Sequence, residues 1–145
     1  MAADDAPRST WAVGFGLTAV LVGCLAASVT FLALTVAVLS GAPPGALAGT
    51  GADEGVLQLA IPIAALAGMG FMVVGPTLAW VLGWSLRRVR HQALHVLTFG
   101  VAGVVLGAIG GAVTGGLEIA ALLGAMVGVA AATGRAVVAP FARRG

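Results

Sequence analysis

The chain has 145 residues, the length of one small domain, and 60% of them are hydrophobic while only 8% are charged. Soluble globular proteins carry about 25% charged residues, so this chain has too little polar surface to fold in water, and we expect an integral membrane protein. The net charge of +2 comes from arginines at the ends of apolar segments, which argues against nucleic-acid binding. The single cysteine excludes a disulfide framework within the chain.

Four apolar segments follow one another, and crossing the hydrocarbon core of a bilayer takes about 20 residues. The four segments cover residues 11–39, 56–86, 96–113 and 117–138. A loop rich in Pro and Gly, residues 40–55, separates the first two segments, and the polar stretch 87–95 separates the second and third. The sequence therefore predicts one all-α membrane domain, residues 1–145, with four transmembrane helices.

The distribution of basic residues predicts the orientation of the chain in the membrane. In the four-helix arrangement they all fall on one side: Arg8, Arg87, Arg88, Arg90, Arg135, Arg143 and Arg144. The other side holds Asp53, Glu54 and Glu118. The positive-inside rule then predicts that both termini lie in the cytoplasm. Lys, Tyr and Asn are absent while Ala, Gly, Val and Arg are abundant, a pattern typical of GC-rich genomes, which indicates a bacterial inner (plasma) membrane.

The three tryptophans lie near the predicted cytoplasmic ends of their helices: Trp11, Trp80 and Trp84. An amphipathic indole ring is stable at headgroup depth, so we expect these residues to be interfacial anchors.

Cys24 ends the sequence LVGC, which resembles the lipobox of bacterial lipoproteins. The apolar run continues well past this cysteine, and Asp4 and Asp5 weaken the basic segment that a signal peptide needs. We therefore expect Cys24 to be a small packing residue. The hydroxyl groups of the first two helices are expected to bond to backbone or neighbouring helices: Ser28, Thr30, Thr35 and Thr77.

Gly75 and Pro76 interrupt the second apolar segment. Pro76 removes a backbone hydrogen bond to the carbonyl of Met72, and Gly75 lowers the resistance to bending. We expect a static kink that fits a long helix into a small bundle. A gating hinge is the alternative.

The polar stretch contains five residues that we expect to contact lipid headgroups or a cytoplasmic partner: Arg87, Arg88, Arg90, His91 and His95. His91 and His95 are four residues apart and would share a helix face, as two metal or haem ligands could. No acidic residue or cysteine lies nearby, and the arginines would repel a cation. We therefore expect neither a metal nor a cofactor.

Small residues recur every fourth position in both of the last two segments. The first series is Gly103, Gly107, Gly111 and Gly115, and the second is Ala120, Gly124, Gly128 and Ala132. This pattern resembles the glycine zipper found in several unrelated membrane proteins. Small residues allow close helix packing in lipid, so the sequence predicts an antiparallel hairpin of the two segments around a turn at residues 114–116.

No ionisable residue lies in the middle of a predicted membrane helix, and Glu118 at the start of the fourth is expected to stabilise its dipole. The chain shows neither a nucleophile with its base nor a nucleotide-binding loop, so we expect no enzyme and identify no small-molecule substrate. The favoured function is an accessory or assembly subunit that packs on itself or on a larger membrane complex through its glycine-rich faces. The alternatives are a small oligomeric channel, holin-like pore or facilitator gated at Gly75-Pro76, and a regulator acting through residues 87–95.

Overall fold

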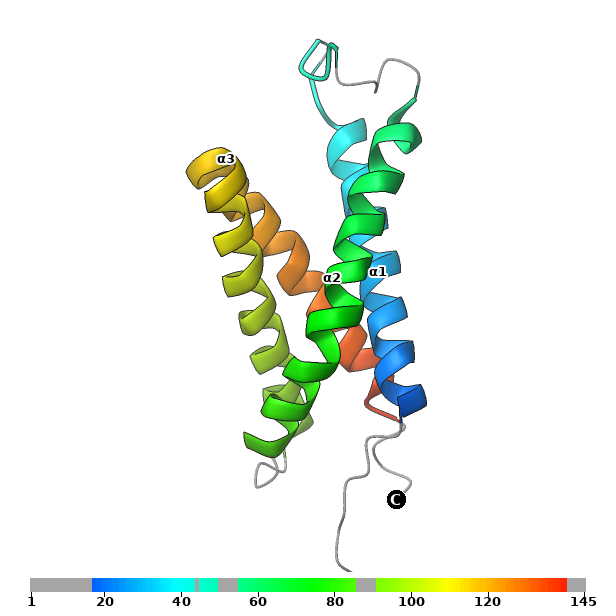
Figure 1. Cartoon of the computed structure of the whole chain (residues 1–145), viewed down its shortest axis with the longest axis vertical. Coiled ribbons are helices and arrows are strands. Elements are labelled where there is room, and N and C mark those ends of the chain that lie inside the picture. Colours follow the sequence, from blue (N-terminus) through cyan, green and yellow to red (C-terminus); the bar gives the residue numbers. More distant parts are fainter. Residues whose placement is uncertain (1–16, 44, 50–54, 86–90, 141–145) are drawn as a thin grey trace, which may run out of the picture.

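The structure is a computed structural model that describes residues 17–43, 45–49, 55–85 and 91–140, and these residues form helices joined by short connections. The helices are α1 (Leu17–Ser40), α2 (Val56–Ser85) and α3 (Gln92–Val138), as Figure 1 shows. All three are long and apolar enough to span a membrane. The prediction of an all-helical chain suited to a membrane is confirmed, and the described ranges contain no strand.

The helix boundaries depart from the predicted segments in three respects. α1 begins at Leu17 in the described part of the chain, because residues 11–16 lie outside it. α3 begins at Gln92, so the polar loop predicted to extend to residue 95 is shorter than expected. The predicted third and fourth segments belong to one element of 47 residues, and of the predicted turn at 114–116 only Gly116 leaves helical geometry.

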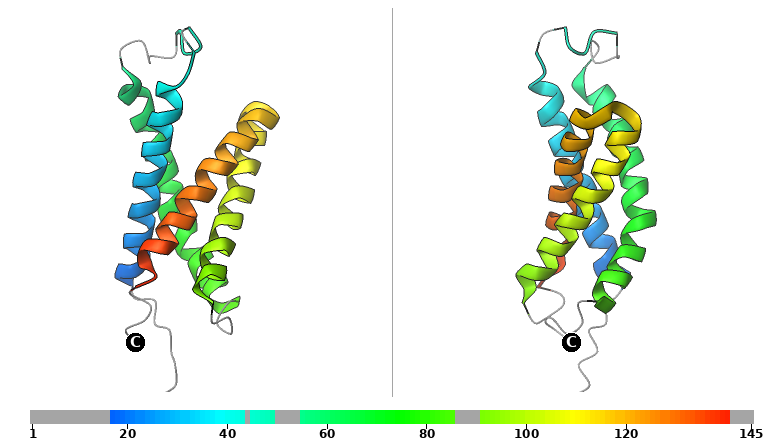
Figure 2. Two further views of the ribbon diagram at one scale, coloured as in Figure 1. Left: turned by 180° about the vertical axis from the view of Figure 1, so that it is seen from behind. Right: turned by 90° about the vertical axis from the view of Figure 1, so that its left-hand side faces the viewer.

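Gly116 reverses the direction of α3. Its φ of 81° and ψ of −165° lie in a region that is open essentially only to glycine. Beyond this residue the chain returns alongside the part that it has just formed (Figure 2). We call residues 92–115 the N-arm of α3 and residues 117–138 its C-arm.

α1 is the central helix, since it packs against both α2 and α3, whereas α2 and α3 scarcely contact each other. At the lower end of Figure 1, the start of α1 lies close to the end of α3. Toward Gly116 the hairpin leans away from α1 and α2 (Figure 2), and residues 112–119 are all exposed on the isolated chain.

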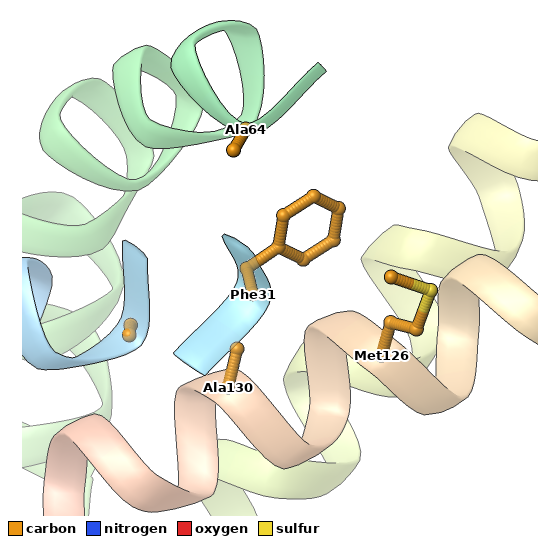
Figure 3. Packing of buried hydrophobic residues seen from close by; sticks show 5 residues of the cluster. Phe31, Ala64, Met126 and Ala130 are labelled. Carbon is orange, nitrogen blue, oxygen red and sulfur yellow. The ribbon is translucent and has the colours of Figure 1, made fainter. Parts of the chain in front are cut away.

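The apolar core lies where α1 meets both neighbours. Phe31 of α1 is only 2% exposed and packs among Ala64 of α2 and Met126 and Ala130 of the C-arm (Figure 3). Phe71 of α2 meets the ring of Phe31 edge-on, with centroids 6.1 Å apart and planes at 70°. This is a favourable aromatic geometry, and it joins α1 to α2 near the middle of their length.

Candidate functional site

The two arms of α3 approach so closely that three glycines of the N-arm have no room for a side chain. A Cβ atom on Gly103 would lie 2.8 Å from the carbonyl oxygen of Val127, and one on Gly107 would lie 2.5 Å from that of Leu123. A Cβ atom on Gly111 would lie 2.5 Å from Cα of Ala120. Because these neighbours are backbone atoms, even alanine would force the arms apart.

The C-arm presents its own small residues to the same surface. A Cβ atom on Gly124 would lie 3.0 Å from the carbonyl oxygen of Val104, and one on Gly128 would lie 3.1 Å from that of Gly100. Ala132 also meets Gly100, at a distance of 3.4 Å between its Cβ and one placed on the glycine. We call this contact between the arms the glycine seam.

Gly115 continues the glycine seam to the reversal of the chain, whereas Gly110 lies outside the seam. Gly115 is exposed, but a Cβ there would lie 2.5 Å from Cγ1 of Ile119 in the C-arm. Gly110 is exposed as well, and a Cβ there would have no heavy atom within 4 Å outside its own helix backbone. Gly110 is therefore a small residue that the packing of the chain itself leaves open.

A second close approach joins α1 to the C-arm, and the fourfold spacing of small residues does not predict it. A Cβ atom on Gly134 would lie 2.5 Å from the carbonyl oxygen of Gly23, and one on Gly23 would lie 3.3 Å from that of Gly134. Neither glycine belongs to either of the two predicted series of small residues at every fourth position, so the spacing within one helix could not predict this contact.

The predicted hinge lies against α1. α2 is helical through both Pro62 and Pro76, and a Cβ atom on Gly75 would lie 3.0 Å from Sγ of Cys24. That sulfur donates a hydrogen bond to the carbonyl oxygen of Phe71 at 3.4 Å, and Cys24 is buried. Cys24 thus packs against the segment of α2 that contains the Gly75-Pro76 pair.

Three of the four hydroxyl groups singled out in the first two helices bond to the carbonyl four residues earlier, as predicted. Ser28 donates to Cys24, Thr30 to Ala26 and Thr35 to Phe31, at 2.8 to 2.9 Å. These hydroxyl groups are satisfied within α1 itself.

A cavity of about 320 Å³ lies between α1, α2 and the two arms of α3. Its lining is apolar except for Cys24 and Arg135 and comes from every helix. The lining residues are Ala19, Val20, Gly23, Cys24, Ala27, Ala67, Gly70, Phe71, Val74, Gly75, Leu78, Ala79, Phe99, Ala102, Gly103, Leu106, Gly107, Val127, Ala131, Gly134, Arg135 and Val138.

Arg135 is the charged residue of this lining, and only 8% of its surface is exposed. Its guanidinium carbon lies 5.9 Å from the centroid of the Phe99 ring, within the range of a cation–π contact. The C-arm places it one helical turn before Val138, where the helix ends. The sequence identified Arg135 as a charge at the end of a membrane segment but not as part of a cavity.

The other predicted site residues are dispersed. Trp80 and Trp84 are 76% and 65% exposed, whereas Trp11 and the arginines Arg87, Arg88 and Arg90 lie outside the described residues. His91 is the N-cap of α3, with an extended backbone, and His95 lies within the helix. His91 therefore lies at the boundary of the helix, four residues before His95.

Glu118 is exposed and follows directly on the break at Gly116, in the first turn of the C-arm. The described residues contain no group of three or more His, Cys, Asp or Glu side chains that could hold a metal ion. Comparison of the chain with protein-family models, with curated proteins and with solved structures finds no match.

Proposed function

We propose that the chain is a small non-catalytic multi-pass protein of a bacterial inner membrane that works as an accessory or assembly subunit of a larger membrane protein. In this proposal the two arms of α3 cross the bilayer separately, which makes four transmembrane segments with both termini in the cytoplasm. The length of α3 supports it, because a straight helix of 47 residues would extend about 70 Å, more than twice the roughly 30 Å of hydrocarbon.

The brevity of the connections supports a partner within the membrane. α1 ends at Ser40 and α2 begins at Val56, while α2 ends at Ser85 and α3 begins at Gln92. Connections of this length leave little chain between the helices to form a binding site or an active site in water. Molecules within the bilayer are therefore the natural targets.

Gly110 is the observation that carries the proposal. Interfaces between membrane helices are enriched in small residues, because these allow two backbones to approach closely. The chain uses Gly103, Gly107 and Gly111 for its own glycine seam, whereas a Cβ on Gly110 would meet nothing. We infer that a transmembrane helix of the partner packs against the N-arm at Gly110.

The experiment is co-purification of the tagged chain in a mild detergent, with every stoichiometric companion identified by mass spectrometry. Gly110→Leu should lose the companion while the chain remains folded, because a Cβ at this exposed position would have no neighbouring atom within 4 Å. Ala121→Leu, at another exposed small residue of α3, is the matched control and should retain it.

Two outcomes would contradict this proposal. Retention of the companion by Gly110→Leu would show that this face is not the interface. A discrete homo-oligomer with no companion would show that a second copy of the chain occupies the face, and the accessory role would then be wrong.

The alternative of a channel gated at Gly75-Pro76 has less support. An ion pathway needs polar groups along its wall, whereas the cavity beside Gly75 is almost wholly apolar, and three hydroxyl groups of α1 bond to their own helix. We expect liposomes that contain the purified chain to show only background leakage of monovalent ions.

A further inference from the structure

The cavity lies toward one end of the molecule. Its lining includes the beginning of α1 at Ala19 and the end of α3 at Val138, and Ala79 and Phe99 lie near the end of α2 and the start of α3. In sequence, these helix ends are the ones nearest to the other six arginines of the chain. At its inner limit the cavity meets the core, because Ala27, Ala67, Phe71 and Val127 contribute to both.

The depth of the cavity matches one leaflet of a bilayer. Its lining extends along α1 from Ala19 to Ala27 and along α2 from Ala67 to Ala79, which at 1.5 Å per residue corresponds to about 12 to 18 Å. Half of a hydrocarbon core of about 30 Å is about 15 Å. The cavity therefore has the length of a lipid tail in the leaflet on the arginine-rich side.

The cavity combines an apolar body with a cation at its outer part. Arg135 lies one turn before the end of α3, and its planar guanidinium presents five N–H donors, a geometry that suits the oxygens of a phosphate group. We propose that the cavity binds an acyl chain of an anionic phospholipid and that Arg135 binds the phosphate of the same molecule.

The size and surroundings of the cavity favour a lipid over a helix of another protein. An α-helix with its side chains is about 10 to 12 Å wide, too wide for a space of about 320 Å³ that also extends over a leaflet's depth. α2 and α3 scarcely contact each other, so packing between these helices does not close that side, and an acyl chain can enter from the bilayer.

The proposal is tested by native mass spectrometry of the delipidated chain in detergent, titrated with a palmitoyl-oleoyl phosphatidylglycerol. The matched phosphatidylcholine has the same tails without net charge, and glycerol phosphate has the headgroup chemistry without tails. We expect the wild-type chain to bind one phosphatidylglycerol in preference to phosphatidylcholine and not to retain glycerol phosphate.

Two variants separate the two parts of the site. Arg135→Gln should reduce the preference for phosphatidylglycerol by about tenfold to a hundredfold, the loss expected for one charged hydrogen-bonding group, and Arg135→Lys should recover part of it. Gly70→Leu should weaken binding of both lipids, because Gly70 lines the cavity and a Cβ there would meet no other atom, so the new side chain has room to fill it.

Ala121→Leu is the matched control, at an exposed small residue that does not line the cavity, and it should bind lipid as the wild type does. Equal binding of the two lipids by the wild type would overturn the role of Arg135, and unchanged binding by Gly70→Leu would overturn the cavity as the site. Failure of this proposal is distinct from failure of the accessory role, because Gly110→Leu tests the partner and Gly70→Leu tests the lipid.

Discussion

Gly107 and Gly110 are three residues apart on the N-arm, but one is tightly packed and the other is open. The backbone of the C-arm lies against Gly107, at a distance that real Cβ atoms do not tolerate, whereas Gly110 faces open space on the isolated chain. Lipid tails surround apolar side chains as favourably as another helix does, so the hydrophobic effect does not drive helices together in a membrane. Close contact between backbones is instead a main source of helix association. The two glycines therefore contribute to different properties of the protein.

Alanine at these two positions should separate the two properties. Gly107→Ala forces the arms of α3 apart, so we expect the free energy of unfolding to fall by about 1 to 3 kcal/mol, as in other overpacked interiors. Gly110→Ala should change it by less than about 0.5 kcal/mol, as for a surface substitution. Pulse proteolysis during a titration with sodium dodecyl sulfate measures both values, and equal losses at the two positions would contradict the glycine seam.

Some of these residue contacts could be foreseen from the sequence and others could not. The fourfold spacing of Gly103, Gly107 and Gly111 shows directly in the sequence, because residues four apart lie on nearly the same face of a helix. The contact between Gly23 and Gly134 depends on where α1 crosses the C-arm, which no spacing within one helix records. The same holds for Arg135, which is buried and lies beside the ring of Phe99 in the N-arm.

At the scale of elements, α3 shows what a hydropathy pattern can and cannot locate. Two apolar segments were visible, but the sequence placed a turn over three residues where only Gly116 leaves helical geometry. The start of α3 was predicted too late because residues 92–95 are polar at two of four positions, and polar residues at a helix end outside the hydrocarbon still adopt helical structure. The composition of a segment indicates whether it lies in lipid or in water, whereas the backbone conformation at a turn depends on single residues.

Gly116 should be the residue on which the reversal of α3 depends. A Cβ there would meet no other atom, but the φ of 81° and ψ of −165° are costly for any side chain, so Gly116→Ala should lower stability by about 1 to 3 kcal/mol. Gly45→Ala, at a loop glycine with a φ of 84°, is the control and should cost less, because no packed hairpin holds that loop in place. The same detergent titration compares them, and a neutral Gly116→Ala would show that the reversal tolerates another backbone geometry.

At the scale of the whole molecule, the arrangement follows from the position of α1 between its neighbours. α1 holds α2 on one side and the C-arm on the other, while the N-arm contacts the rest of the chain mainly through the glycine seam. This arrangement leaves a cavity between α2 and the N-arm, near the end of the molecule where α3 begins and ends. The sequence predicted helices and a hairpin, but the choice of neighbours depends on contacts among residues far apart in the chain.

The same arrangement leads to a prediction about topology. If both arms of α3 cross the bilayer, the chain makes an even number of crossings, and the loop between α1 and α2 lies on the opposite side from both termini. Alkaline phosphatase, which is active only outside the cytoplasm, should then be active when fused after Ala48 and inactive when fused after residue 145. A green fluorescent protein, which fluoresces only on the cytoplasmic side, should give the opposite pattern. Active phosphatase at both positions would mean that α3 does not return across the membrane. Activity at residue 145 alone would mean that the chain has the reverse orientation, and the placement of the cavity in the cytoplasmic leaflet would then be wrong as well.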